Sequence, residues 1–123
     1  KNEGINFIQL VSPTTSDLRL KKIIKDSHDM IYYISMLSTT GGKLKVSPKK
    51  ILRKYSKIKK QNKLKNVVIG FGITENTIKS LKKADGLVVG SAICKEISKS
   101  IKKRQNTVKY ATNVVKKLRN KIA

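Results

Sequence analysis

Two short glycine-containing segments are the part of this sequence best suited to ligand chemistry. They are Gly70-Phe71-Gly72-Ile73-Thr74 and Val88-Val89-Gly90-Ser91-Ala92-Ile93. Each segment ends an apolar, largely β-branched run with glycine, and helix-forming sequence follows it. Bare backbone at the C-terminal end of a strand, facing the start of a helix, can approach a phosphate closely and donate amide hydrogens to it. The two segments therefore predict a binding site for a phosphorylated small molecule.

The elements that must position these segments alternate between strand and helix four times. The apolar runs at 5–11, 30–36, 67–71 and 86–89 predict strands. Helices are expected to begin at the capping residues Ser16, Ser47 and Thr74 and near Ala92, and a last helix carries Val108, Ala111, Val115, Leu118 and Ile122. Short apolar strands with helical crossovers predict a parallel sheet, either open and doubly wound or part of a barrel. Since four units are half of an eight-unit barrel, we favour a half barrel that forms a single partial domain over residues 1–123.

Glycines gather at the ends of three of these strands. Gly41-Gly42, Gly72 and Gly90-Ser91 all lie at or just beyond a predicted C-terminal strand end. In a barrel those ends meet on one face, where the Ser91 amide and hydroxyl could donate and the next helix adds its positive dipole end. Three glycine positions in register favour a phosphate cradle over three unrelated tight turns.

Acid–base and metal chemistry have little support in this sequence. No acidic residue is expected at the C-terminal end of a strand: Asp17, Glu75 and Glu96 are placed in first helical turns, and Asp85 and His28 on the opposite face. One cysteine and one histidine predict no metal site. The sequence thus predicts a ligand cradle without a catalytic carboxylate, a metal or a cofactor. Tyr32 and Tyr33 are adjacent in one strand, so they should face opposite sides of the sheet.

The net charge of +22 allows two interpretations. It comes from 29 Lys and Arg against 7 Asp and Glu. Such a charge suits a polyanion, so a basic nucleic-acid-binding module is an alternative function. However, only four of the basic residues are arginines, and lysines lie along every predicted helix instead of forming one patch. We therefore favour codon bias over a nucleic-acid ligand. Another alternative is a different phosphate-binding half barrel that pairs with itself.

The single cysteine and the hydropathy pattern indicate the cellular compartment of the protein. Cys94 follows Ala92-Ile93 and is expected to pack as a small hydrophobe. With no disulfide possible inside these residues and no apolar run of spanning length, we predict a cytoplasmic protein without a membrane segment. Because the first residue is Lys1, we also expect a piece of a longer chain.

Five stretches together resemble the C-terminal half of the tryptophan synthase alpha chain. They are Leu10-Val11-Ser12-Pro13-Thr14-Thr15, Ile31-Tyr32-Tyr33-Ile34-Ser35, Thr40-Gly41, Gly70-Phe71-Gly72-Ile73 and Val89-Gly90-Ser91-Ala92-Ile93. They follow the family's order from its fifth strand to its last helix. The resemblance implies strands 5–8 of a TIM (β/α)8 barrel. It also implies a retro-aldol lyase that cleaves indole-3-glycerol phosphate to indole and glyceraldehyde 3-phosphate.

The resemblance also implies roles for individual residues. Gly41, Gly72, Gly90 and Ser91 would bind the substrate phosphate. Tyr32 and Phe71 would line the substrate pocket, and Thr40 would belong to the mobile loop that orders the closed site. The implied partner is a beta chain that uses pyridoxal phosphate, in an alpha2-beta2 complex, so the cofactor would belong to the partner.

Two departures from the family pattern matter. The usual Gly-Val-Thr-Gly loop reads Ser38-Thr39-Thr40-Gly41 here, and loss of the first glycine should stiffen it. The family's catalytic glutamate and aspartate belong to its N-terminal half and have no counterpart in this sequence. We therefore expect this chain alone to be inactive.

Overall fold

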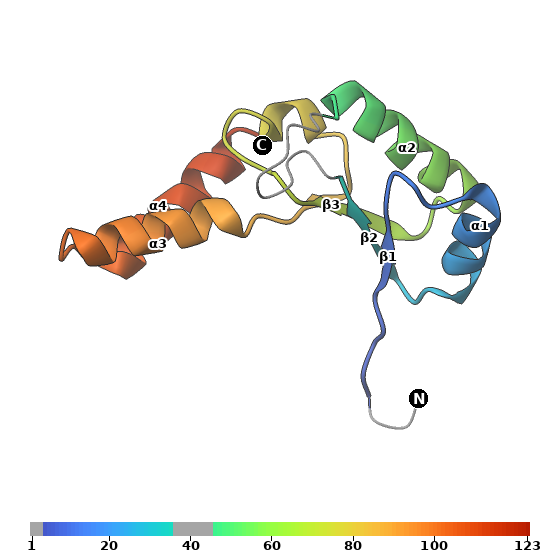
Figure 1. Ribbon diagram of the computed structural model, residues 1–123, viewed down its shortest axis with the longest axis horizontal. Helices are drawn as coiled ribbons and strands as arrows, with labels where there is room; N and C mark the ends of the chain where they lie inside the picture. Colours follow the sequence, from blue (N-terminus) through green and yellow to red (C-terminus); the bar gives the residue numbers. More distant parts are fainter. Residues whose placement is uncertain (1–3, 36–45) are drawn as a thin grey trace.

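One sheet of four parallel strands, in chain order β1-β2-β3-β4, organises the computed structural model, which describes residues 4–35 and 46–123 (Figure 1). The strands are β1 (Gln9–Val11), β2 (Met30–Ile34), β3 (Asn66–Gly70) and β4 (Gly86–Leu87). Neighbours in the chain are neighbours in the sheet, whereas a doubly wound sheet reverses its strand order part-way. The observed strand order therefore supports part of a barrel and not an open, doubly wound sheet.

Two amphipathic helices, α1 (Asp17–Asp26) and α2 (Pro48–Gln61), cover one face of the sheet (Figure 1). Both begin where the sequence predicts. The Ser16 hydroxyl accepts from the Arg19 amide, and the Ser47 hydroxyl accepts from the Lys50 amide, both at 3.4 Å. The buried helical positions recur at helical spacing and are Leu20, Ile23, Ile24, Ile51, Tyr55 and Ile58.

The core lies between these helices and alternate residues of the strands. Val11, Ile31, Tyr33, Val67 and Ile69 are almost completely buried there. Burial raises the pKa of the Tyr33 hydroxyl to about 12, because the charged phenolate is disfavoured away from water. The residues between them, such as Tyr32, point to the other face, so the predicted opposition of Tyr32 and Tyr33 is confirmed. Among the described residues, no helix covers that second face (Figure 1).

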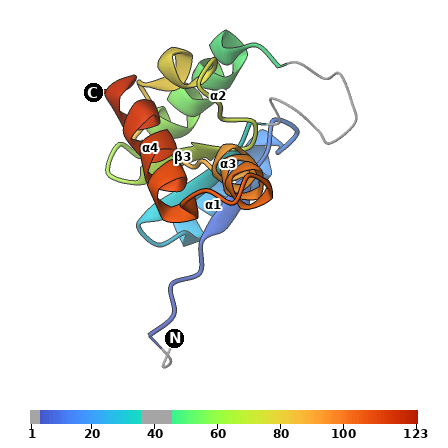
Figure 2. The same ribbon diagram turned by 90° about the vertical axis from the view of Figure 1, so that its left-hand side faces the viewer.

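The last two helices, α3 (Ser91–Lys102) and α4 (Thr107–Asn120), lie side by side and extend away from the sheet (Figures 1 and 2). Leu118 is the predicted inward residue of α4 that is buried, whereas Val108 is 75% exposed. Cys94 is also exposed, so its predicted packing as a small hydrophobe is wrong. Because this pair of helices extends beyond the sheet, part of its apolar surface has no layer to pack against.

Several boundaries differ from the sequence prediction. β1 begins at Gln9, and residues 5–8 pair with no strand of the described part of the chain, since the ladder with β2 starts at Gln9 opposite Ile31. Thr74 does not cap a helix: a short 3-10 helix, η1 (Ile78–Leu81), begins later, after Thr77. Glu75 and Glu96 are accordingly outside first helical turns. No helix in the described part of the chain is long and apolar enough to cross a membrane.

Candidate phosphate-binding site

The two glycine turns leave neighbouring strands at the same edge of the sheet. Ile69 of β3 is paired in register with Leu87 of β4. The Val88 amide also donates to the Ile69 carbonyl at 2.8 Å, which extends this pairing past the end of β4. Parallel strands place their C-terminal ends together, so the segments after Gly70 and after Val89 begin side by side. The sequence prediction that brings these turns together is confirmed in this respect.

The first turn has an unusual backbone conformation. Phe71 and Gly72 both have a φ of 70°, in the left-handed region that residues other than glycine rarely adopt. The buried Ser35 hydroxyl lies 2.7 Å from both the Gly70 and the Phe71 carbonyl oxygens. The Thr77 hydroxyl donates to the Gly72 carbonyl at 3.2 Å. The turn is thus bound by Ser35, the residue just after β2, on one side and by its own continuation on the other.

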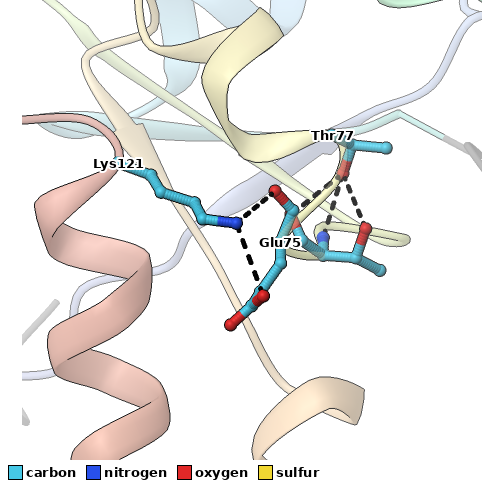
Figure 3. A network of polar contacts seen from close by, with 4 residues as sticks. Glu75, Thr77 and Lys121 are labelled. Atoms are coloured by element: carbon cyan, nitrogen blue, oxygen red, sulfur yellow. Dashed lines mark hydrogen bonds and ion pairs between the residues drawn. The ribbon is translucent and has the colours of Figure 1, made fainter.

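The continuation of this turn is tied to the last helix (Figure 3). The Thr74 amide donates to the Thr77 hydroxyl at 2.9 Å. Lys121, just after α4, donates to the Glu75 carbonyl at 3.3 Å and to the Glu75 carboxylate at 3.4 Å. These contacts link the end of α4 to the segment after Gly72, so the glycine turn and the helix pair form one connected region.

The second turn is open. Gly90 is the N-cap of α3, its carbonyl accepts from the Ile93 and Cys94 amides, and a methyl group added at its Cα would meet nothing within 4 Å. Its φ of −117° is accessible to any residue. An open hollow of about 790 Å³ begins at Gly90 and Ser91 and runs along α3, where it is lined by Cys94, Lys95, Ser98, Lys99, Lys102 and Lys103. The first turn of α3 holds no acidic residue, so its amide hydrogens and positive dipole end suit an anion.

Two aromatic residues lie at the first glycine turn. The Tyr32 ring crosses Gly70, and a methyl group added at Gly70 would come within 1.8 Å of the Tyr32 hydroxyl oxygen. Glycine is therefore required at 70 for the ring to lie there. Phe71, the next residue in the chain, is 55% exposed. Both predicted pocket residues thus present aromatic surface next to the first turn.

The acidic side chains of the described residues are engaged in ion pairs or lie on the outer surface. Asp17 pairs with Lys57 at 2.7 Å, and the Lys57 ammonium lowers the pKa of the Asp17 carboxyl. Asp85 lies at the N-terminal end of the strands, where it accepts from the Val67 amide at 2.8 Å and pairs with Lys59 at 2.9 Å. Burial acts to raise the pKa of Asp85, but these bonds and one from Tyr55 outweigh it and lower the pKa. This network holds the far end of the sheet.

His28 also lies away from the glycine turns, just after α1, where it contacts Asp29 at 3.0 Å. No group of three or more potential metal ligands among His, Cys, Asp and Glu exists in the described ranges. Gly41 and Thr40, predicted for the phosphate site and the loop, lie outside the described residues, as does Glu3. Sequence reasoning missed Ser35, because its two partners are 35 and 36 residues away.

Parallel βα units in chain order, with glycine turns at the C-terminal edge of the sheet, define part of a β/α barrel. A sequence model of the family described as "Tryptophan synthase alpha chain" matches residues 1–123. The chain belongs to this family.

Individual relatives agree with this assignment. The tryptophan synthase alpha chain of Pelagibacter ubique is 77% identical over all 123 residues, which cover 46% of that protein. The crystal structure of the alpha subunit from Legionella pneumophila matches 97% of this chain and 43% of its own, with a TM-score of 0.79 and 27% identity. A Pyrococcus furiosus structure described as the a2b2 complex matches 97% of this chain and 46% of its own, with a TM-score of 0.67 and 28% identity. The chain therefore spans about half the length of its relatives, and the predicted half of a TIM barrel is confirmed.

Proposed function

We propose that this chain supplies the phosphate-binding half of a tryptophan synthase alpha subunit, a lyase acting on indole-3-glycerol phosphate. The observation that carries the proposal is the pair of glycine turns on adjacent strands β3 and β4, in a chain that belongs to the alpha-chain family. The family's substrate is a phosphate ester with an apolar aromatic end. Around the two turns, backbone amides are available for the phosphate and aromatic surface for the indole end.

In this proposal the substrate phosphate lies between the two turns. The Gly72 and Gly90 backbones let it approach, and the Ser91 amide and hydroxyl donate to it at the start of α3. Lys95 and Lys99 line the adjoining hollow and make the potential there more positive. Gly41 and Thr40 would close the site from the segment between β2 and α2, as the family resemblance implies.

Tyr32 and Phe71 would contact the indole part of the substrate. The Tyr32 ring lies over Gly70 at the first turn, and the Phe71 side chain, within that turn, is 55% exposed. A flat apolar ring gains about 0.5–1.5 kcal/mol from a well-oriented aromatic neighbour beyond the burial of its area. The two residues therefore orient the indole end while the turns hold the phosphate end.

The cleavage needs groups that these residues do not supply. The bond between indole C3 and the glycerol chain breaks, its electron pair returns to the ring, and C3 takes a proton. The adjacent hydroxyl loses its proton as its carbon becomes the aldehyde of glyceraldehyde 3-phosphate. A general acid and a general base must handle those protons. In our proposal the acid and the base are carboxyl groups from the other half of the barrel. The 123 residues alone would therefore bind the substrate but not cleave it.

Completion of the barrel also explains the uncovered face of the sheet. Leu10 is 58% exposed and Val88 40% exposed, and among the described residues β1 and β4 each have a partner strand on one side only. Such edges promote association with other strands. We expect the isolated chain to aggregate or to pair with a complementary half barrel; a monodisperse, cooperatively folding monomer in sedimentation and urea unfolding would contradict this.

The alpha-chain family further implies a beta-chain partner that carries pyridoxal phosphate. The Pyrococcus furiosus neighbour is described as an a2b2 complex, and its likeness to this chain supports the same assembly here. Indole released by the alpha subunit would then pass to the partner. Co-purification of a complete alpha chain containing these residues with a tagged beta chain tests the assembly, and failure to co-purify would contradict it.

A hybrid chain tests the function directly. The part of the Pelagibacter ubique alpha chain that precedes the matched region is joined to these 123 residues, whose 77% identity to the replaced part makes correct packing expected. We expect the hybrid to release indole from indole-3-glycerol phosphate and the 123-residue chain to release none. A hybrid that folds with the native circular dichroism spectrum, but neither binds nor cleaves the substrate, would overturn the proposal.

A further inference from the structure

The Gly70–Gly72 turn keeps a strained conformation, and the structure identifies what holds it. Phe71 has a φ of 70°, which costs a residue with a side chain about 1–2 kcal/mol. Strained backbone persists only where its surroundings over-determine it. Among the described residues, the hydrogen-bond donors to the Gly70 and Phe71 carbonyls all belong to Ser35.

Ser35 makes three contacts with the turn. Its amide donates to the Gly70 carbonyl at 3.0 Å, and its hydroxyl oxygen lies 2.7 Å from the Gly70 and Phe71 carbonyl oxygens. The single hydroxyl proton is therefore shared between two acceptors. The residue is fully buried, so water cannot replace these bonds if the hydroxyl is removed.

The position of the Phe71 carbonyl also determines the direction of the next amide. The peptide unit is planar and trans, so the Gly72 N–H points away from the carbonyl that faces Ser35. That N–H therefore points away from the buried end of β2. In the described part of the chain the Gly72 amide has no hydrogen-bond acceptor.

We propose that Ser35 is a positioning residue for phosphate affinity: its hydroxyl orients the Phe71–Gly72 peptide so that the Gly72 amide faces the phosphate. This inference rests on the proposed function, because it assigns the means by which that same site is kept in its binding conformation. Without the hydroxyl, the peptide can rotate toward a more relaxed conformation, and the amide leaves the ligand. The aromatic surface of Tyr32 does not depend on this rotation, because the ring lies over Gly70.

Two ligands separate positioning from general damage. Indole-3-propanol phosphate keeps the indole and the phosphate but cannot be cleaved, and indole-3-propanol lacks the phosphate. Both are titrated calorimetrically into the hybrid alpha chain and its variants. The ratio of the two dissociation constants measures what the phosphate contributes, whatever happens to the overall stability.

For Ser35→Ala we expect about a 10-fold loss of affinity for the phosphate ligand, since one buried hydrogen bond is removed, and less than a two-fold change for indole-3-propanol. Ser35→Thr retains the hydroxyl and should restore most of the ratio. The matched control is Ser100→Ala, because Ser100 is equally buried and its hydroxyl also donates to a carbonyl, that of Ile97, at 2.7 Å. The control should leave the ratio unchanged.

The outcomes distinguish this inference from the proposed function. If Ser35→Ala weakens both ligands equally, or neither, the positioning role is overturned. If Ser35→Ala does not fold, Ser35→Cys decides, because a thiol is a weaker donor of similar shape and should give an intermediate ratio; an unchanged ratio overturns the role. If the unsubstituted hybrid itself shows no preference for the phosphate ligand, the proposed function fails instead.

Discussion

The two glycine turns use glycine for different physical reasons. At Gly72 the backbone itself requires it, because a φ of 70° strains any other residue. At Gly90 the backbone is ordinary, and the space around the α-carbon is empty within 4 Å. The first turn is bound to Ser35 and Thr77, whereas the second starts a helix whose N-cap, Gly90, makes no side-chain hydrogen bond. Gly72 is therefore needed for the backbone conformation of the first turn. Gly90 leaves open space at the start of α3, where we propose that the ligand's phosphate lies.

The largest effect predicted from this comparison is for Gly90→Asp. Aspartate is a good N-cap residue and the site is open, so the free energy of unfolding of the hybrid alpha chain should not fall. The carboxylate, however, would occupy the space proposed for the phosphate and repel it. We expect more than about a 100-fold loss of affinity for indole-3-propanol phosphate, equivalent to about 2.7 kcal/mol. Unchanged affinity would remove Gly90 from the site.

Gly72→Ala should show the opposite balance. The added methyl group strains the left-handed backbone, so we expect the unfolding free energy to fall by about 1–2 kcal/mol in urea titration. The phosphate ligand should bind more weakly as well, because the relaxed turn moves the amide. A variant as stable as the parent would mean that φ is not positive at this position in solution.

Much of this architecture could be predicted from local sequence. Ser16 and Ser47 cap helices as expected, since a hydroxyl three residues before a backbone amide acts within one turn. The alternation of Tyr32 and Tyr33 follows from strand geometry alone. Thr74 failed as a cap, because its segment forms a turn around the Thr77 hydroxyl before η1 begins.

The parts of the site that escaped prediction depend on distant contacts. Nothing near Phe71 in the sequence indicates a left-handed φ, and the residue that donates to its carbonyl, Ser35, follows another strand, β2. The exposure of Cys94 depends on how α3 extends beyond the sheet, which local hydropathy does not encode. Glycine at a strand end thus indicates a site, whereas the reason for each glycine requires the structure.

Asp85 offers a control for the comparison, because it holds the far ends of the same two strands. Its pKa is lowered in the folded state: burial acts to raise it, but the Val67 amide, Lys59 and Tyr55 outweigh that effect. The resulting stability is present above the unfolded pKa of about 3.9 and is lost as the pH falls through the lower folded pKa. Asp85→Asn should cost about 1 kcal/mol at pH 7 and flatten the acid limb of urea unfolding.

The ratio of the dissociation constants for indole-3-propanol phosphate and indole-3-propanol should not change in Asp85→Asn. The Asp85 network lies at the opposite end of the strands from the glycine turns. A changed ratio would mean that the two ends of the sheet are coupled. The distinction between stability and affinity drawn for the two turns would then no longer hold.

The smallest expected effect is that of Gly90→Ala. A methyl group meets no neighbour at this position, but alanine is a poorer N-cap than glycine, so the unfolding free energy should fall by about 0.5–1 kcal/mol. The same methyl group projects into the space left for the ligand, and the affinity for indole-3-propanol phosphate should drop about 3-fold to 10-fold. Indole-3-propanol should bind as before. If affinity were unchanged while the unfolding free energy fell by about 2 kcal/mol or more, Gly90 would serve the fold as Gly72 does, and the contrast between the two turns would be wrong.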